Sequence, residues 1–572
     1  MTKMLLRVSL LTSILPLFCL AALPAGAADV TAERLANADK EPQNWLTHHR
    51  TYDGQRFSPL DQINRGSVKG LKLAYAVALG GNAQDENLEA TPLVEDGFIY
   101  MVDQWGVVYK IDGRSGDVGR IVWRMDPGQE KAPHANRGVA LWGNLVVAAA
   151  NSPARLIGID KESGKTVWET DLQDQPDVEL TGAPLAVKDK ILMGAAGGDQ
   201  GARDWLAGLD AKTGKLLWRH YTIPAPGEPG SETWKDKNNA WQTGGGALYV
   251  TGTYDAKTNQ TIWGVGNPVP MYDARYRPGD NLFTNSAVSF DPDTGKMNWY
   301  FQYTPGDMWD YDEIGTHILF DAQVNGEMRT LLTHSGRNGF LYTMDRNNGQ
   351  ILGAKPYLAR INWTKGVDPK TGKPVDYDPK ADIQKYSGLA AMEVGGPAMP
   401  FCPVSSGGNN FWPSTYSPKT KLLYIPTIAT CGEIKTDPSL SNKAKGWKGG
   451  AYKSNERWQS EVIAADPVTG KIVGKAEMPY AVYSGALSTA GGLVFVGFND
   501  GTFAAFDDTT LEQVWKINVG SGFNAPPISF AVNGKQYVAI ASGLSTIAKG
   551  KNASAPELKN QRNLPMLFVF SL

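Results

Sequence analysis

The stretch LIGIDKESGKTVW, residues 156–168, is one copy of a phrase that recurs along the chain. Each full copy has an apolar run, an Asp, a turn and a Trp eight positions after the Asp. The turn usually reads D-x-x-[TS]-G, which is typical of a hairpin between two β-strands. Full copies also span 206–218, 287–299 and 503–515, and weaker copies follow Asp112, Asp345 and Asp466.

Copies that recur roughly every 40–55 residues predict the blades of a β-propeller. A regularly placed Trp would pack between neighbouring blades, where its large apolar area is best used. Residues 414–426 are interpreted as a decayed eighth copy, so we expect an all-β, eight-bladed β-propeller with Trp-docking repeats. The gap between Asp345 and Asp466 predicts two blades, and the gap between Asp210 and Asp291 predicts an insertion.

Composition agrees with this fold class. The 572 residues include 63 Gly and 35 Pro, and 10% are aromatic, which favours many short strands joined by turns. The formal net charge of −2 gives no basic field for a nucleic-acid partner.

The N-terminus predicts export. Lys3 and Arg7 precede an apolar run that ends at the small residues 25–27, as in a secretory signal peptide cleaved after Ala27. An uncleaved membrane anchor is the alternative. We therefore expect a signal peptide over 1–27 and one propeller domain over 28–572, located in the periplasm without a membrane span after cleavage.

Two cysteines remain after this cleavage, Cys402 and Cys431. In an oxidising compartment an isolated pair most simply forms a disulfide, and two free buried thiols are the alternative. No C-x-x-C-H sequence occurs, so the chain carries no attachment motif for a c-type haem.

The stretch GDMWDYDEIGT, residues 306–316, holds the most distinctive acids. In a strand, Asp310 and Asp312 would share one face, and such a pair is unfavourable without a cation between them. Asp199 and Asn267 are further hard oxygen donors suited to such a cation. Arg137 and Arg337 suit an anionic, planar ligand. From the residues alone, turn caps and surface ion pairs are the alternative interpretation.

The wording and order of nine short phrases favour a functional site over turn caps and surface ion pairs. They are NLEATPLV, HANRGVAL, ELTGAPLA, GAAGGDQGAR, TGGGALYV, WGVGNPVP, GDMWDYDE, HSGRNGF and GGNNFWP. In this order they resemble the pyrroloquinoline-quinone (PQQ) dependent alcohol dehydrogenases, the methanol/ethanol dehydrogenase family, over nearly the whole mature chain. The resemblance implies an eight-bladed propeller that holds PQQ and a metal ion in its central funnel.

The resemblance also implies roles for individual residues. Asp310 would be the general base, and Arg337 would hydrogen-bond the quinone oxygens. Cys402 and Cys431 fall where methanol dehydrogenases have a structural disulfide. The expected PQQ contacts are Glu89, Arg137, Thr181, Gly197, Gly198, Tyr249, Arg337 and Asn410. The expected metal ligands are Asp199, Asn267, Asp310 and Asp312.

Asp312 bears on the identity of the metal. A second acid two residues after the base resembles the lanthanide-dependent members of the family. Asp199, Asp310 and Asp312 together with a PQQ carboxylate would over-neutralise a divalent ion, so a trivalent lanthanide is favoured and Ca²⁺ is the alternative.

Some positions depart from the family pattern. The chain has no adjacent Cys-Cys pair to cover PQQ, and Tyr249 stands where the stacking Trp is expected. Tyr483 replaces the Trp over the pocket of methanol dehydrogenases, which favours a larger or secondary alcohol as substrate. Residues 223–234, IPAPGEPGSETW, also suit a PQQ-dependent sugar or polyol dehydrogenase, and a non-catalytic propeller scaffold is the remaining alternative. The expected electron acceptor is a soluble cytochrome c, and a homodimer stays open.

Overall fold

The computed structural model describes residues 29–80, 86–388 and 396–572. The predicted signal peptide over 1–27 lies outside these ranges. Strands dominate these ranges, and the two α-helices within them, α1 (Ala32–Ala36) and α2 (Thr546–Asn552), are short. None of the helices in the described ranges has the length and apolar character needed to cross a membrane.

The strands of the described residues form nine sheets, eight of which contain four or five strands. The first three contain β3 (Leu93–Glu95), β4 (Phe98–Val102), β5 (Val108–Asp112) and β6 (Arg120–Met125); β7 (Ala140–Trp142), β8 (Leu145–Ala150), β9 (Arg155–Asp160) and β10 (Thr166–Asp171); and β11 (Leu185–Val187), β12 (Lys190–Gly194), β13 (Trp205–Asp210) and β14 (Leu216–Tyr221). The next two contain β15 (Thr253–Asp255), β16 (Gln260–Gly264), β17 (Ser286–Phe290) and β18 (Met297–Gln302); and β19 (Ile318–Val324), β20 (Glu327–Ser335), β21 (Phe340–Asp345) and β22 (Ile351–Pro356).

The sixth sheet corrects one prediction. It contains β24 (Thr415–Ser417), β25 (Leu422–Ile428), β28 (Ser460–Ala465) and β29 (Ile472–Met478). Because β25 pairs directly with β28, the decayed copy at 414–426 is the first hairpin of the sheet that ends near Asp466. The prediction of two blades in this gap is therefore wrong. The extra residues include a separate sheet of β23 (Met399–Phe401), β26 (Gly432–Thr436) and β27 (Gly450–Lys453).

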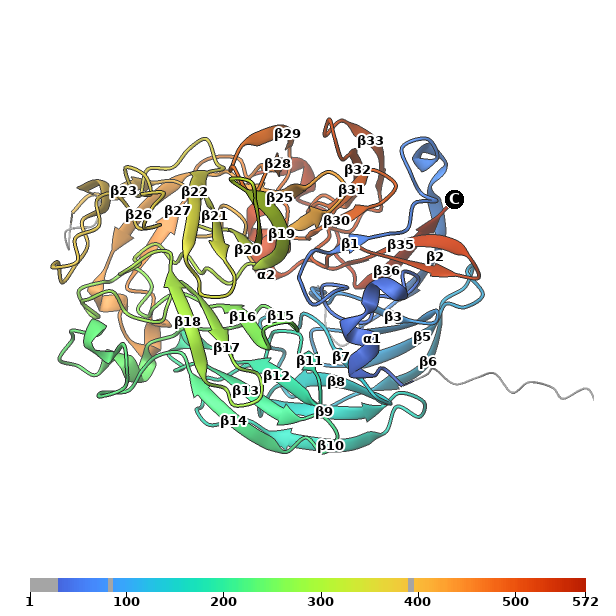
Figure 1. Cartoon of the computed structure of the whole chain (residues 1–572), viewed down its shortest axis with the longest axis horizontal. Coiled ribbons are helices and arrows are strands. Elements are labelled where there is room, and N and C mark those ends of the chain that lie inside the picture. The colour runs from blue at the N-terminus through green and yellow to red at the C-terminus, as the bar shows by residue number, and fades with distance from the viewer. Residues whose placement is uncertain (1–28, 81–85, 389–395) are drawn as a thin grey trace, which may run out of the picture.

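The last two sheets include strands from near the N-terminus, and the eighth carries no copy of the recurring phrase. The seventh sheet contains β30 (Ala486–Thr489), β31 (Leu493–Gly497), β32 (Thr502–Asp507) and β33 (Gln513–Asn518), with β1 (Phe57–Ser58) added in parallel. The eighth pairs β2 (Lys72–Ala78) with β36 (Met566–Ser571), followed by β35 (Lys535–Ser542) and β34 (Ile528–Val532). Figure 1 shows the sheets following one another around the molecule, so that this last sheet joins the N-terminal and C-terminal strands. The fold is an all-β propeller.

The recurring phrase forms the predicted hairpins. Strand β9 ends at Asp160, and its partner β10 carries Trp168. A Cβ placed on Gly158 would lie 2.3 Å from Cε2 of Trp168, and one on Gly214 would lie 2.4 Å from its Cε3. Gly158 belongs to the same hairpin and Gly214 to the β13–β14 turn of the next sheet. The indole ring of Trp168 therefore contacts both sheets.

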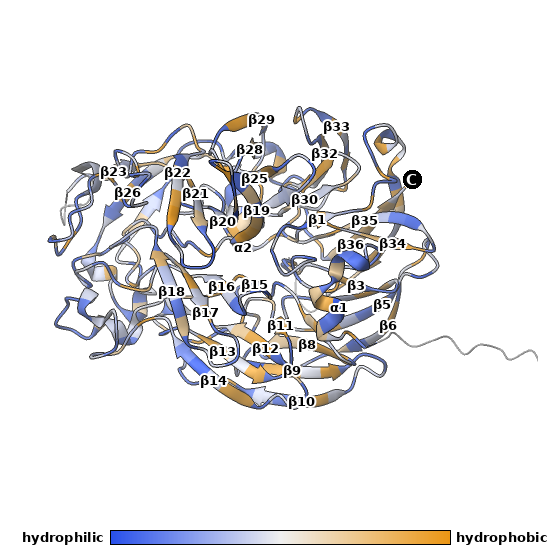
Figure 2. Ribbon diagram, viewed as in Figure 1, coloured by the Kyte–Doolittle hydropathy of each residue, from blue (hydrophilic) through white to orange (hydrophobic). Residues whose placement is uncertain are grey.

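Burial follows the order of the strands within each sheet. In the third sheet, the inner strand β12 is buried except at Lys190, whereas the outermost strand β14 is exposed or half-buried. In Figure 2, β14 carries both hydrophobic and hydrophilic residues along the outer edge of the molecule. In an antiparallel sheet, the loop before the first strand and the loop after the second emerge at the same edge. These loops carry the predicted site residues.

Candidate active site

One cavity of about 430 Å³ brings together all twelve of the predicted PQQ and metal residues. They come from loops of six of the sheets. Some of these loops precede the first strand of a sheet, namely β3, β7, β11, β15, β19 and β24, and the one before β19 is also the loop after β18. The others follow the second strand, namely β12, β16 and β20. These twelve residues are Glu89, Arg137, Thr181, Gly197, Gly198, Asp199, Tyr249, Asn267, Asp310, Asp312, Arg337 and Asn410.

Asp310 lies in an irregular loop between β18 and β19, so the strand geometry considered for Asp310 and Asp312 is wrong. Its backbone is left-handed, with φ of 62°, a conformation that Asp tolerates better than most residues. The carboxylate of Asp307 accepts hydrogen bonds of 3.2 Å from the backbone N–H groups of Trp309 and Tyr311. The two aromatic rings are buried and stacked at 5.8 Å. These contacts fix the loop on both sides of Asp310.

Arg337 connects the acids of the cavity. Its Nη1 donates to the backbone carbonyl of Asp310 at 2.8 Å, and its Nη2 donates to Asp312 Oδ2 and to Asn410 Oδ1 at 2.8 Å each. Nη2 also lies 3.0 Å from the hydroxyl of Tyr249, which itself donates to Asp312 Oδ2 at 2.6 Å. The other oxygen of Asp312 accepts from the backbone N–H of Asn267 at 2.7 Å.

The acids carry more negative charge than their neighbours neutralise. Burial raises the pKa of Asp310 well above its usual value, Asp199 and Asp312 raise it further, and Arg337 lowers it. Burial is also the main cause that raises the pKa of Asp199 to about 6, although this side chain faces the open cavity, and Asp312 adds to the effect. Three carboxylates share one guanidinium, which fits a cation.

The oxygen donors fit a hard cation in type. Asp199, Asn267, Asp310 and Asp312 offer carboxylate and amide oxygens, the ligands that Ca²⁺ and lanthanides prefer. Within the ranges that the structure describes, no three His, Cys, Asp or Glu side chains already meet as a metal group. The fit therefore rests on the charge and on the type of these donors.

The loop that carries Asp199 needs its glycines. Gly197 has φ of 116°, and a Cβ there would lie 2.0 Å from the carbonyl oxygen of Asp177. A Cβ on Gly198 would lie 2.9 Å from Asp204 Oδ2. Only glycine allows the backbone to pass this closely, so the two residues hold Asp199 at the cavity wall.

A second group of residues can hold an anion. Arg137 pairs with Glu89 at 3.0 Å and donates to Thr181 Oγ1 at 3.2 Å. Its guanidinium lies 4.9 Å from the ring of Tyr249. The Nε atoms of Arg137 and Arg337 are buried without a hydrogen-bond partner in the described residues. Two cationic side chains with donors to spare fit a planar ligand that bears carboxylates, as PQQ does.

Two residues near Asp310 escaped the sequence interpretation. The hydroxyl of Tyr272 lies 3.4 Å from Asp310 Oδ2 and 3.0 Å from the hydroxyl of Ser405, and both residues are buried. No motif marks either position. Tyr483, which departs from the family pattern, also lines the cavity, and so does His134.

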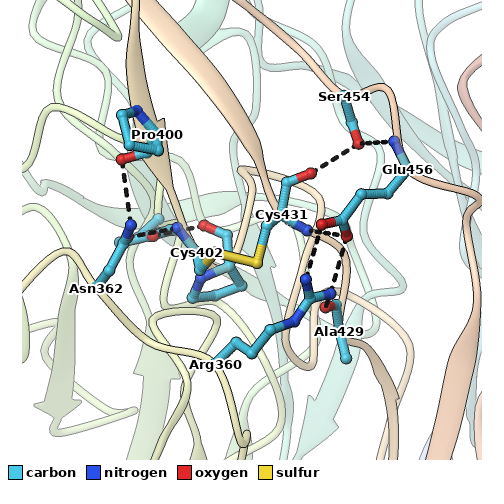
Figure 3. The surroundings of a disulfide bond; sticks show 10 residues. Arg360, Asn362, Pro400, Cys402, Ala429, Cys431, Ser454 and Glu456 are labelled. Atoms are coloured by element: carbon cyan, nitrogen blue, oxygen red, sulfur yellow. Dashed lines mark hydrogen bonds and ion pairs between the residues drawn. A yellow bond between two sulfur atoms is a disulfide. The ribbon is translucent and has the colours of Figure 1, made fainter.

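The predicted disulfide between Cys402 and Cys431 is confirmed, with an S–S distance of 2.05 Å (Figure 3). It joins the ends of β23 and β26. The backbone N–H of Cys402 donates to Asn362, and that of Cys431 donates to Glu456 (Figure 3). Because Cys402 lies three residues before Ser405, the bond anchors the segment that forms this wall of the cavity.

A propeller whose loops bring two arginines and three aspartates to one cavity has the architecture of a cofactor-dependent enzyme. Residues 45–354 and 454–538 match the family model described as "Glucose/ethanol/alcohol dehydrogenase, beta-propeller domain" for PQQ proteins. The quinohemoprotein alcohol dehydrogenase ADH-IIG of Pseudomonas putida is 35% identical over 92% of this chain and 76% of its own length. The quinoprotein alcohol dehydrogenase PedH of Pseudomonas putida is 33% identical over 96% of this chain and 95% of its own.

Solved structures agree. The structure of ADHIIG from Pseudomonas putida HK5 has a TM-score of 0.85 and 33% identity, over 96% of this chain and 82% of its own. A europium-containing methanol dehydrogenase has a TM-score of 0.85 and 29% identity, over 94% of this chain and all of its own. The chain belongs to the PQQ-dependent alcohol dehydrogenase family and is a quinoprotein oxidoreductase that acts on an alcohol.

Proposed function

We propose that the cavity oxidises an alcohol with Asp310 as the general base that takes the proton of the substrate hydroxyl. The observation that carries this proposal is the convergence of all twelve predicted residues on one cavity. A base must reach the hydroxyl that it deprotonates, and Asp310 lines the cavity, where the Tyr272 hydroxyl lies 3.4 Å from its Oδ2. Arg337 sits 3.8 Å from Asp310 Oδ1 and stabilises its ionised form.

The cofactor residues divide into two groups. The guanidinium of Arg137 would bind the carboxylates of PQQ, and Thr181 and Glu89 would contact its polar edge. On the other side, Arg337 and Asn410 would hydrogen-bond its quinone oxygens. The ring of Tyr249 and the backbone of Gly197 and Gly198 would complete the binding surface. When bound, PQQ accepts the two electrons of alcohol oxidation and the metal polarises it as a Lewis acid.

We propose a trivalent lanthanide as the metal, with Ca²⁺ as the alternative. Asp199, Asn267 and Asp310 would hold it, and Asp312 would add a third carboxylate. The support is the charge of this cluster and the likeness to a europium-containing methanol dehydrogenase. Activity with Ca²⁺ and none with La³⁺ after reconstitution would refute this choice.

The setting of the enzyme follows from the same reasoning. We propose that the eight sheets of four or five strands are eight blades of one propeller over 28–572, with the Trp side chains docked between blades. We also propose export to the periplasm after cleavage at residue 27, and a soluble cytochrome c as electron acceptor. A homodimer remains an open alternative to a monomer.

A substrate panel with an artificial electron acceptor tests the proposed function. The protein is reconstituted with PQQ and either La³⁺ or Ca²⁺. Primary alcohols, secondary alcohols, polyols and sugars are then compared as substrates. We expect oxidation that requires both PQQ and a metal. A protein that binds PQQ but oxidises only sugars or polyols would move the assignment to that substrate class. No PQQ binding at all would leave a non-catalytic propeller.

A further inference from the structure

The two oxygens of Asp312 differ in how fully they are occupied. Oδ1 accepts one hydrogen bond, from the backbone N–H of Asn267. Oδ2 accepts two, from Arg337 Nη2 at 2.8 Å and from the Tyr249 hydroxyl at 2.6 Å. A carboxylate has about two acceptor positions on each oxygen. Oδ2 is therefore saturated, and a cation that uses this oxygen must displace a donor.

Of the two donors on Oδ2, the Tyr249 hydroxyl is the one that has no other acceptor among the described residues. Arg337 also donates to Asp310 and Asn410, so its position is fixed by several contacts. Tyr249 has a single acceptor for its proton, Asp312. Its ring is held separately, because the guanidinium of Arg137 lies 4.9 Å from the ring and Nη1 of Arg137 lies 3.5 Å from the backbone oxygen of Tyr249.

We propose that the Tyr249 hydroxyl competes with the bound cation for Asp312 and so sets the preference of the site between trivalent and divalent ions. This inference rests on the proposed metal role of Asp199, Asn267, Asp310 and Asp312. Tyr249 is a specificity-determining residue that acts through Asp312. The attraction between a carboxylate and a cation grows with the charge of the cation, so releasing Asp312 favours the trivalent ion more than the divalent one.

The test compares Tyr249→Phe with the wild-type chain by isothermal titration calorimetry. Metal-free protein with saturating PQQ is titrated with La³⁺ and, separately, with Ca²⁺. Because a hydrogen bond to a charged group changes an equilibrium constant by about tenfold or more, we expect the La³⁺ affinity to rise by about tenfold in Tyr249→Phe and the Ca²⁺ affinity by less, so that the La³⁺/Ca²⁺ affinity ratio rises. In an Asp312→Asn background, the same substitution should leave the ratio unchanged.

Two further variants make the result decisive. Tyr254 is a buried tyrosine outside the cavity whose hydroxyl donates to Asn259, and Tyr254→Phe should leave the ratio unchanged. Tyr249→Trp also removes the phenolic hydroxyl while keeping a ring, so the test does not depend on one variant folding.

The outcomes separate this inference from the proposed function. If the wild-type chain binds La³⁺ but the ratio stays the same or falls in Tyr249→Phe, the inference is wrong and the metal site stands. An equal rise in the Asp312→Asn background would also overturn it. If the wild-type chain binds neither ion, the proposed metal site is wrong, and the inference falls with it.

Discussion

Replacing Arg337 by Lys removes the guanidinium fork but keeps the positive charge. Arg337 makes four contacts in the cavity, to the carbonyl of Asp310, to Asp312, to Tyr249 and to Asn410. One ammonium group cannot satisfy these widely separated partners. Hydrogen bonds to charged groups contribute about 1.5–3 kcal/mol each. We expect Arg337→Lys to lose about 3 kcal/mol of transition-state stabilisation, which lowers kcat/KM roughly 100-fold.

The assay is oxidation of an alcohol by the reconstituted enzyme with an artificial electron acceptor. Arg346→Lys is the matched control, because Arg346 is also buried and paired with two carboxylates, Asp255 at 2.7 Å and Asp321 at 2.8 Å, but does not line the cavity. This control should lower Tm and leave kcat/KM unchanged. The reasoning is refuted if Arg337→Lys retains wild-type kcat/KM, or if both variants lose activity equally.

Three further predictions follow from single residues. Asp310→Asn should retain PQQ binding, measured by absorbance titration. Its kcat should fall by about 10²–10⁴-fold, the usual contribution of a general base, and retained activity would contradict this role of Asp310. Cys402→Ser opens a disulfide that spans 29 residues, and should lower the free energy of unfolding by about 3–4 kcal/mol in denaturant titrations, whereas an unchanged value would contradict a structural role. Gly197→Ala should weaken metal binding in calorimetry, because the new Cβ would clash with the carbonyl oxygen of Asp177. Wild-type affinity would show that the loop accommodates the methyl group without moving Asp199.

The hairpins of the propeller were predictable from sequence because each copy carries its own turn and each full copy its own Trp. The last sheet was not, because it is built from β2 and β36, which lie at opposite ends of the chain and carry no copy of the phrase. The gap after Asp345 was misjudged for the same reason: β25 pairs with β28 across an insertion, and pairing over such a distance leaves no local pattern.

The candidate site was likewise predictable from the sequence only in part. Asp310 and Arg337 were named because they lie in distinctive phrases, and the structure places both at the cavity. The spacing argument for Asp310 and Asp312 assumed a strand, but the loop is irregular and Asp310 adopts a left-handed conformation. Tyr272 was missed because its contact with Asp310 spans 38 residues. Only the fold brings the two side chains together.

The most direct test of the account is a crystal structure of the protein with PQQ and La³⁺, with anomalous scattering used to locate the metal. We predict one strong peak in the cavity, in contact with Asp199, Asn267 and Asp310 and beside the bound PQQ. A metal bound elsewhere on the protein, or PQQ bound outside this cavity, would contradict it.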